Sequence, residues 1–245
     1  MWMILAGLGT LVSVGFDFIR MRQFAPGTDL SVSVEFIIIS AVLIALIPVA
    51  VKINHKLDLP GGPLITATLG REPQPYRWRD VVLGGVLWAV ILMIIALVGT
   101  GLFLYFFPSF IPKHPINKTP IVKPSELWLL CGVVIAASAG VQEEILFRFV
   151  LIGLFSRTLM TIKGNAEQRP SRGLLWLATI MQAYCFGMAH VRPDFYLARG
   201  IAGVGEFAIH ALIQPQTWTG IFLGWLYLSR GLETAMVTHI FLDLL

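Results

Sequence analysis

Charge and cysteine are scarce in this chain of 245 residues, and each shortage excludes a class of protein. Charged residues make up 13% of the sequence, which is about half their share in soluble domains. Hydrophobic residues make up 56%, more than a soluble domain of this length can bury, so an ordinary cytosolic enzyme and a disordered chain are both excluded. Cys131 and Cys185 both lie in apolar runs, so we expect no disulfide framework and no cysteine-rich zinc site.

Several motifs of soluble enzymes are also absent from the sequence. It contains no His-Glu-x-x-His, no Gly-x-Ser-x-Gly and no glycine-rich phosphate loop. The net charge is +4, but the lysines and arginines fall between apolar runs instead of gathering in one patch. This distribution is typical of loops that flank membrane spans, and it argues against a nucleic-acid partner.

What the sequence has in abundance is long apolar runs, and a helix needs about 20 such residues to cross a bilayer. The runs cover approximately residues 1–19, 30–51, 81–107, 125–155, 173–190, 207–229 and 232–245. The third run has no charge at all, and Pro215 is expected to kink or break the sixth. We therefore predict an all-α, polytopic transmembrane bundle of seven or eight spans that encloses a polar intramembrane cavity.

The ends of the apolar runs give a predicted topology. The first run follows no basic segment and has no small-residue cleavage site, so we expect a retained span and not a signal peptide. Lysines and arginines are slightly more frequent on the loops after the second, fourth and sixth runs than on the other loops. By the positive-inside rule, this asymmetry predicts a cytoplasmic N-terminus.

Three groups of ionisable residues stand out within the apolar runs, because each such residue costs about 2.5–3.5 kcal/mol on insertion into a membrane. They are Glu143, Glu144, Arg148, His190, His239 and Asp243. Glu144 and Arg148 are four residues apart and can pair on one helix face, and so can His239 and Asp243. Glu143 is turned by about 100° from Glu144 and should face a different neighbour. The depths of these residues in their runs allow one common site within the membrane.

Carboxylates and imidazoles that converge in a dry cavity are suited to activating water. A glutamate can act as a general base, and a neutral histidine can share the proton of the water. A second histidine can stabilise the oxyanion of a tetrahedral intermediate. The residue types therefore favour peptide hydrolysis without a covalent nucleophile.

Three motifs, in order, resemble a known family: Glu143-Glu144-x-x-x-Arg148, Phe186-x-x-x-His190 and His239-x-x-x-Asp243. They are similar to the motifs of the CAAX prenyl protease and bacteriocin-processing family, also called CPBP or Abi. Its eukaryotic members are Ras-converting endopeptidases of the endoplasmic reticulum. The resemblance covers about residues 125–245. It divides the chain into N-terminal membrane helices and loops (1–124) and a catalytic core (125–245). We expect the two parts to form one integral membrane unit.

The resemblance implies an intramembrane endopeptidase that cleaves a prenylated or otherwise membrane-anchored substrate. It implies an integral, multi-pass location, in the plasma membrane of a prokaryote or the endoplasmic reticulum of a eukaryote. Glu143 would be the general base, and His190 would hold the attacking water with it. Glu144 and Arg148 would support the base. His239 and Asp243 would form the oxyanion side; the family often has Asn at the latter position, so we expect Asp243 to orient His239 or to be protonated.

Other interpretations remain open from the sequence. The paired glutamates with Arg148 fit a structural ion pair, and His190 fits an interfacial residue. The chain could be a non-catalytic immunity or scaffold protein, or an ion- or proton-coupled transporter. Two histidines with carboxylates could hold zinc, but they lie on different runs and not as a preset pair on one helix, so we expect no cofactor. The Gly220-x-x-x-Gly224 step also fits the family and is most simply a site of close helix packing.

Overall fold

The fold is described from a computed structural model of the chain. The structure describes residues 31–61, 77–106, 126–165, 169–191, 196 and 200–245. Within these ranges the chain forms helices and short connections and contains no strand, so the predicted all-α class is confirmed for them. The first predicted span, residues 1–19, lies outside the described residues.

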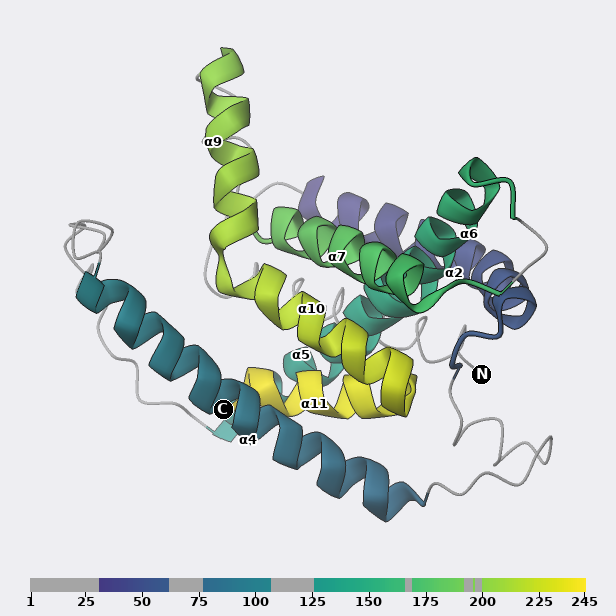
Figure 1. The fold of residues 1–245 in the computed structure, drawn as a ribbon. Coiled ribbons are helices and arrows are strands. Elements are labelled where there is room, and N and C mark those ends of the chain that lie inside the picture. Colours follow the sequence, from purple (N-terminus) through teal and green to yellow (C-terminus); the bar gives the residue numbers. More distant parts are fainter. Residues whose placement is uncertain (1–30, 62–76, 107–125, 166–168, 192–195, 197–199) are drawn as a thin grey trace.

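The helices follow the predicted apolar runs closely. They are α2 (Ser31–Leu57), α4 (Trp78–Phe106), α5 (Glu126–Glu143), η2 (Glu144–Leu151), α6 (Ile152–Ile162), α7 (Arg172–Ala189), α9 (Gly200–Ile213), α10 (Pro215–Arg230) and α11 (Leu232–Leu244) (Figure 1). The sixth run is divided between α9 and α10, as Pro215 predicted. Pro215 is the first residue of α10, a position where its missing N–H costs nothing.

The fourth run forms α5, η2 and α6 in direct succession, with helical backbone angles at both junctions of η2. The middle segment, η2, is a π-helix of eight residues that begins at Glu144. π-Helices are rare and occur frequently at functional sites. The paired glutamates therefore lie where the helix changes from α to π geometry.

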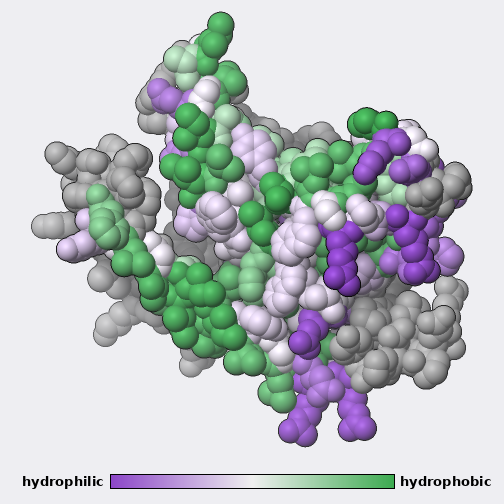
Figure 2. Space-filling view, in the orientation of Figure 1, coloured by the Kyte–Doolittle hydropathy of each residue, from purple (hydrophilic) through white to green (hydrophobic). Residues whose placement is uncertain are grey.

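Within the described residues, two helical stretches are long and apolar enough to cross a membrane, by length and composition. They are Trp78–Gly99 in α4 and Ala136–Ile162 across α5, η2 and α6. Large apolar side chains of α4, such as Leu87, Ile94 and Leu97, are exposed, and Figure 2 shows hydrophobic residues along this helix and along α9. An exposed apolar surface of this extent fits lipid better than water. The number of spans and the polar cavity remain predictions.

Helix α11 packs against α4, α5 and α10 (Figure 1). Gly85 of α4 leaves no room for a side chain beside Val237, and Gly140 of α5 leaves none beside Ile240. The chain enters α11 from α10 through Gly231, whose φ of 91° favours glycine. Close approach at these glycines therefore fixes α11 beside the end of α5.

Helices α7 and α10 run side by side, and the predicted glycine step joins them (Figure 1). Gly220 packs against Ala183, and Gly224 packs against Thr179 and Gln182. The expected packing role of this step is therefore seen in the structure. Helix α9, in contrast, projects away from the other helices (Figure 1).

Candidate active site

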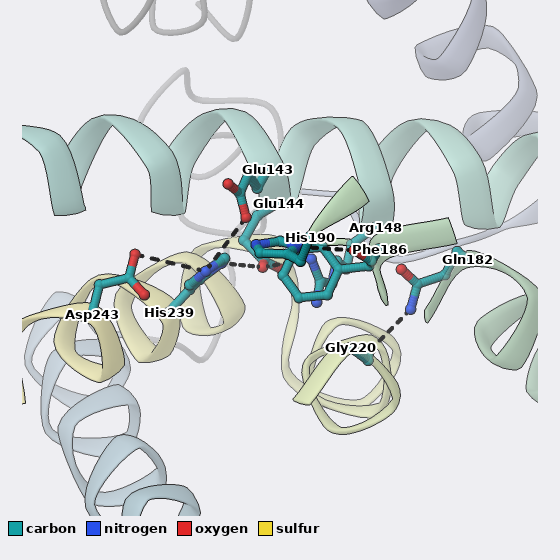
Figure 3. Close-up of polar contacts among 9 residues, drawn as sticks. All are labelled: Glu143, Glu144, Arg148, Gln182, Phe186, His190, Gly220, His239 and Asp243. Carbon is teal, nitrogen blue, oxygen red and sulfur yellow. Dashed lines mark hydrogen bonds and ion pairs between the residues drawn. The ribbon is translucent and has the colours of Figure 1, made fainter. Parts of the chain in front are cut away.

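The two paired glutamates lie at the junction of α5 and η2, facing α11 (Figure 3). Glu143 is the last residue of α5 and Glu144 the first of η2. The close approach of Gly140 to Ile240 lies one turn before them and beside His239. Helix packing at a small residue thus brings the first and third motifs together.

Glu144 is the buried centre of this site. Its Oε1 lies 2.9 Å from Nη1 of Arg148 and 2.7 Å from Nδ1 of His239. The side chains of Glu144 and Arg148 are 0% exposed and that of His239 is 6% exposed. A carboxylate only accepts hydrogen bonds, so Nδ1 of His239 donates to Glu144. The predicted pair of Glu144 with Arg148 is present, and it extends to the histidine of the third motif.

The Arg148 guanidinium has few polar partners besides Glu144. It lies over the ring of Phe186, 4.5 Å from the ring centroid, and 5.9 Å from that of Phe147. Within the described part of the chain, its nitrogen atoms make no hydrogen bond of good geometry. The buried positive charge is therefore balanced by the Glu144 carboxylate and by cation–π contact.

The other nitrogen of His239 faces two more accessible carboxylates. Nε2 lies 3.7 Å from Oε2 of Glu143 and 3.8 Å from Oδ2 of Asp243. Their side chains are 31% and 37% exposed, respectively. Both separations are longer than a hydrogen bond. The orienting contact that the sequence analysis assigned to Asp243 is thus made at short range by Glu144.

His190 follows the last residue of α7, and its ring has a defined orientation. Nδ1 lies 2.8 Å from the carbonyl oxygen of Phe186. A carbonyl only accepts, so Nδ1 donates, and Nε2 of the neutral ring keeps its lone pair. The His190 ring centroid lies 4.6 Å from that of Phe186, which lies 5.9 Å from that of His239. Phe186 is thus in contact with both histidine rings.

The structure brings all six predicted residues into one region (Figure 3). Ion-pair distances connect five of them: Glu143, Glu144, Arg148, His239 and Asp243. His190 makes no ion pair with these residues among the contacts of the described chain, but it is within electrostatic range of Glu143 and Asp243. The arrangement therefore places two proton acceptors, Glu143 and Nε2 of His190, near one another.

Two buried amides near this site were not found from the sequence. Gln182 of α7 donates from Nε2 to the carbonyl oxygen of Gly220, at 2.9 Å. Its signal in the sequence is the spacing of Gln182, Phe186 and His190 at every fourth residue, which places them on one helix face. Asn54 of α2 donates to the carbonyl oxygen of Phe149, at 2.8 Å. Its signal is weaker, an isolated amide just beyond the second apolar run.

The same geometry bears on the alternative that the two histidines and the carboxylates hold a zinc ion. Among the described residues, no group of three or more histidine, cysteine, aspartate or glutamate side chains is arranged to hold a metal ion. The Nδ1 atoms of His190 and His239 are both engaged by protein groups, which leaves their Nε2 atoms available.

Comparison with known families matches one family model. Residues 125–245 match the model described as type II CAAX prenyl endopeptidase, Rce1-like. No match is found among curated proteins or among solved structures. The matched segment includes α5 to α11, and with them all six residues of the candidate site, whereas α2 and α4 lie before it. The predicted family resemblance is confirmed for this segment.

Proposed function

Because residues 125–245 belong to the Rce1-like family of type II CAAX prenyl endopeptidases, we propose that the chain is an intramembrane endopeptidase that uses a glutamate-activated water. The observation that carries this proposal is the contrast between two adjacent glutamates. Glu143 is partly exposed and lies near Nε2 of His239, whereas Glu144 is fully buried against Arg148. An accessible carboxylate can reach a substrate and a water, and a buried one can hold the groups around it.

The attacking water would bind between Glu143 and His190. Both offer lone pairs, because Nδ1 of His190 already donates to a carbonyl and Nε2 is free to accept. Glu143 takes one proton as the water oxygen forms a bond to the carbonyl carbon of the substrate. It then returns that proton to the leaving amine as the carbon–nitrogen bond breaks. No covalent enzyme intermediate is needed.

The oxyanion of the tetrahedral intermediate would be stabilised by His239. With Nδ1 held by Glu144, the protonated ring donates from Nε2 to the oxyanion. Glu144 and Arg148 are buried and fix the ring in advance, so little reorganisation is needed during the reaction. Asp243, whose Oδ2 lies 3.8 Å from Nε2, would border the oxyanion side of the site.

We further propose that the substrate is anchored in the membrane, by a prenyl group or another lipid or by a helix of its own. The support is the position of Glu143 within the stretch Ala136–Ile162, which is long and apolar enough to cross a bilayer. At 1.5 Å per residue, Glu143 lies about 10 Å from the start of this stretch. A multi-pass location, in the plasma membrane of a prokaryote or the endoplasmic reticulum of a eukaryote, follows from the same proposal.

The test uses purified protein in lipid vesicles, with one peptide in a prenylated and an unlipidated form. Glu143→Gln should lower turnover of the prenylated peptide by roughly 10²–10⁴-fold, because it removes the general base while it keeps the shape of the side chain. The thermal midpoint should change little, since Glu143 is partly exposed. Full activity of Glu143→Gln would refute the enzyme assignment at this site. Equal cleavage of both peptides would refute the anchored substrate.

A further inference from the structure

Asn54 is a polar residue on the buried face of α2. Among the side chains of α2 that the structure describes, the other buried residues of this face are Ile47, Ala50 and Leu57, all apolar. The Asn54 side chain is equally buried, with 3% of its surface exposed. A buried amide in an apolar contact costs free energy unless it is hydrogen-bonded, so its partners indicate why an amide occupies this position.

The Asn54 amide connects three helices. Nδ2 donates to the main-chain carbonyl oxygen of Phe149 in η2, at 2.8 Å, and lies 3.5 Å from the hydroxyl of Tyr227 in α10. Oδ1 has no hydrogen-bond partner among the described residues. The amide therefore makes its hydrogen bonds through the donor Nδ2, and the closest acceptor is a backbone carbonyl of the π-helical segment.

The neighbouring backbone is shaped to receive this amide. Oδ1 of Asn54 occupies the space in which a side chain at position 153 would lie, and Ile53 lies next to it. Gly153, at the start of α6, thus lets α2 approach the end of η2 closely. The amide and the glycine form one contact between α2 and the helix that carries Glu144 and Arg148.

A π-helix needs support from its surroundings, because an ordinary α-helix is the more favourable form of a chain. The Asn54 contact is to Phe149, the residue directly after Arg148 and five after Glu144. A return of η2 to α geometry would change the directions in which Glu144 and Arg148 project relative to α6. Their short contacts with each other and with His239 depend on those directions.

We propose that Asn54 is a positioning residue that holds η2 in its π-helical form and so keeps Glu144 aligned with His239. Asn54 lies outside the segment that matches the family model, so the N-terminal half of the chain contributes to the geometry of the site. The catalytic consequence rests on the proposed function, whereas the effect on η2 does not.

The experiment compares Asn54→Leu, which keeps the size of the side chain but removes its donor, with two other variants. Gly153→Ala keeps the donor but displaces it. Leu57→Ala is the matched control, since it truncates a buried residue one turn away on the same helix. Hydrogen–deuterium exchange of the peptide that covers residues 144–153 is measured in vesicles, together with kcat and KM.

Asn54→Leu and Gly153→Ala should both speed exchange in this peptide and lower kcat roughly tenfold to a hundredfold with KM nearly unchanged, because Glu144 and His239 lose their alignment. The double variant should be no worse than either single one, since both act on one contact. Leu57→Ala should lower the thermal midpoint without either effect. The proposal is overturned if Asn54→Leu matches Leu57→Ala in exchange and kcat, or if the two variants are additive.

The proposed function and the positioning role of Asn54 can fail independently of each other. If Glu143→Gln keeps full activity, the enzyme assignment fails, while the exchange of residues 144–153 still shows whether Asn54 supports η2. If Glu143→Gln is inactive and exchange in Asn54→Leu equals that of the wild type, the positioning role fails and the enzyme assignment stands.

Discussion

Glu144 and His239 are 95 residues apart in the chain, and their side chains meet at 2.7 Å in a buried contact. This pair separates the site into two layers. On one side of the imidazole lie the fully buried Glu144 and Arg148, and on the other lie the partly exposed Glu143 and Asp243. The buried layer can fix the ring, and the accessible layer can meet a substrate.

The two adjacent glutamates should therefore respond differently to the same substitution. Glu144→Gln leaves the Arg148 guanidinium buried without its counter-charge and should destabilise the fold by about 3–5 kcal/mol. Activity should fall as well, because His239 loses the carboxylate that orients it. Thermal unfolding in detergent and a peptide-cleavage assay measure the two effects.

Glu143→Gln is the matched control for this experiment, since it makes the same chemical change one residue earlier at a partly exposed side chain. It should lose activity with little loss of stability. Equal loss of stability in both variants would contradict the division into a buried and an accessible layer.

Two neighbouring glycines of α4 give a second matched test. A methyl group at Gly85 would overlap with Val237 of α11, whose branched side chain is stiff, whereas nothing lies within 4 Å of a methyl group at Gly84 among the described residues. Gly85→Ala should destabilise by about 1–3 kcal/mol and lower activity, because it displaces the helix that carries His239. Gly84→Ala should stabilise by about 0.5–1 kcal/mol, as alanine is the better helix former. Effects of the same sign and size would contradict the close packing of α4 on α11.

The predicted topology can be tested at the two ends of α4. Single cysteines are introduced at Arg77 and at Tyr105, which are both exposed, in a background with Cys131 and Cys185 replaced by alanine. A membrane-impermeant thiol reagent should label the two positions from opposite faces, with Arg77 on the cytoplasmic side. Labelling of both from one face would show that α4 does not cross the membrane.

Metal dependence is decided by chelation. A water activated by Glu143 and His190 needs no metal, so activity should survive incubation with a strong chelator and dialysis. Elemental analysis of the purified protein provides an independent readout. A large loss of activity that stoichiometric zinc restores would show that the histidines serve as zinc ligands.

The sequence alone determined much of this protein. The long apolar runs predicted the all-α class and most helix bounds. They could do so because the free-energy cost of exposing an apolar run to water is local and adds up residue by residue along the chain. Pro215 predicted the break before α10 for an equally local reason, its missing N–H. Glu144 and Arg148 were predicted to pair because a helix fixes the distance between residues four apart.

The tertiary structure decided the contacts between segments distant in the chain. The sequence assigned the orientation of His239 to Asp243 by the same four-residue rule, but Glu144 makes the short contact from another helix. The π geometry of η2 and its contact with Asn54 were likewise invisible, since they depend on how α2 packs. The spacing of residues within one helix is set by the backbone. Contacts between helices depend on close packing at residues such as Gly140, and this packing exists only in the folded chain.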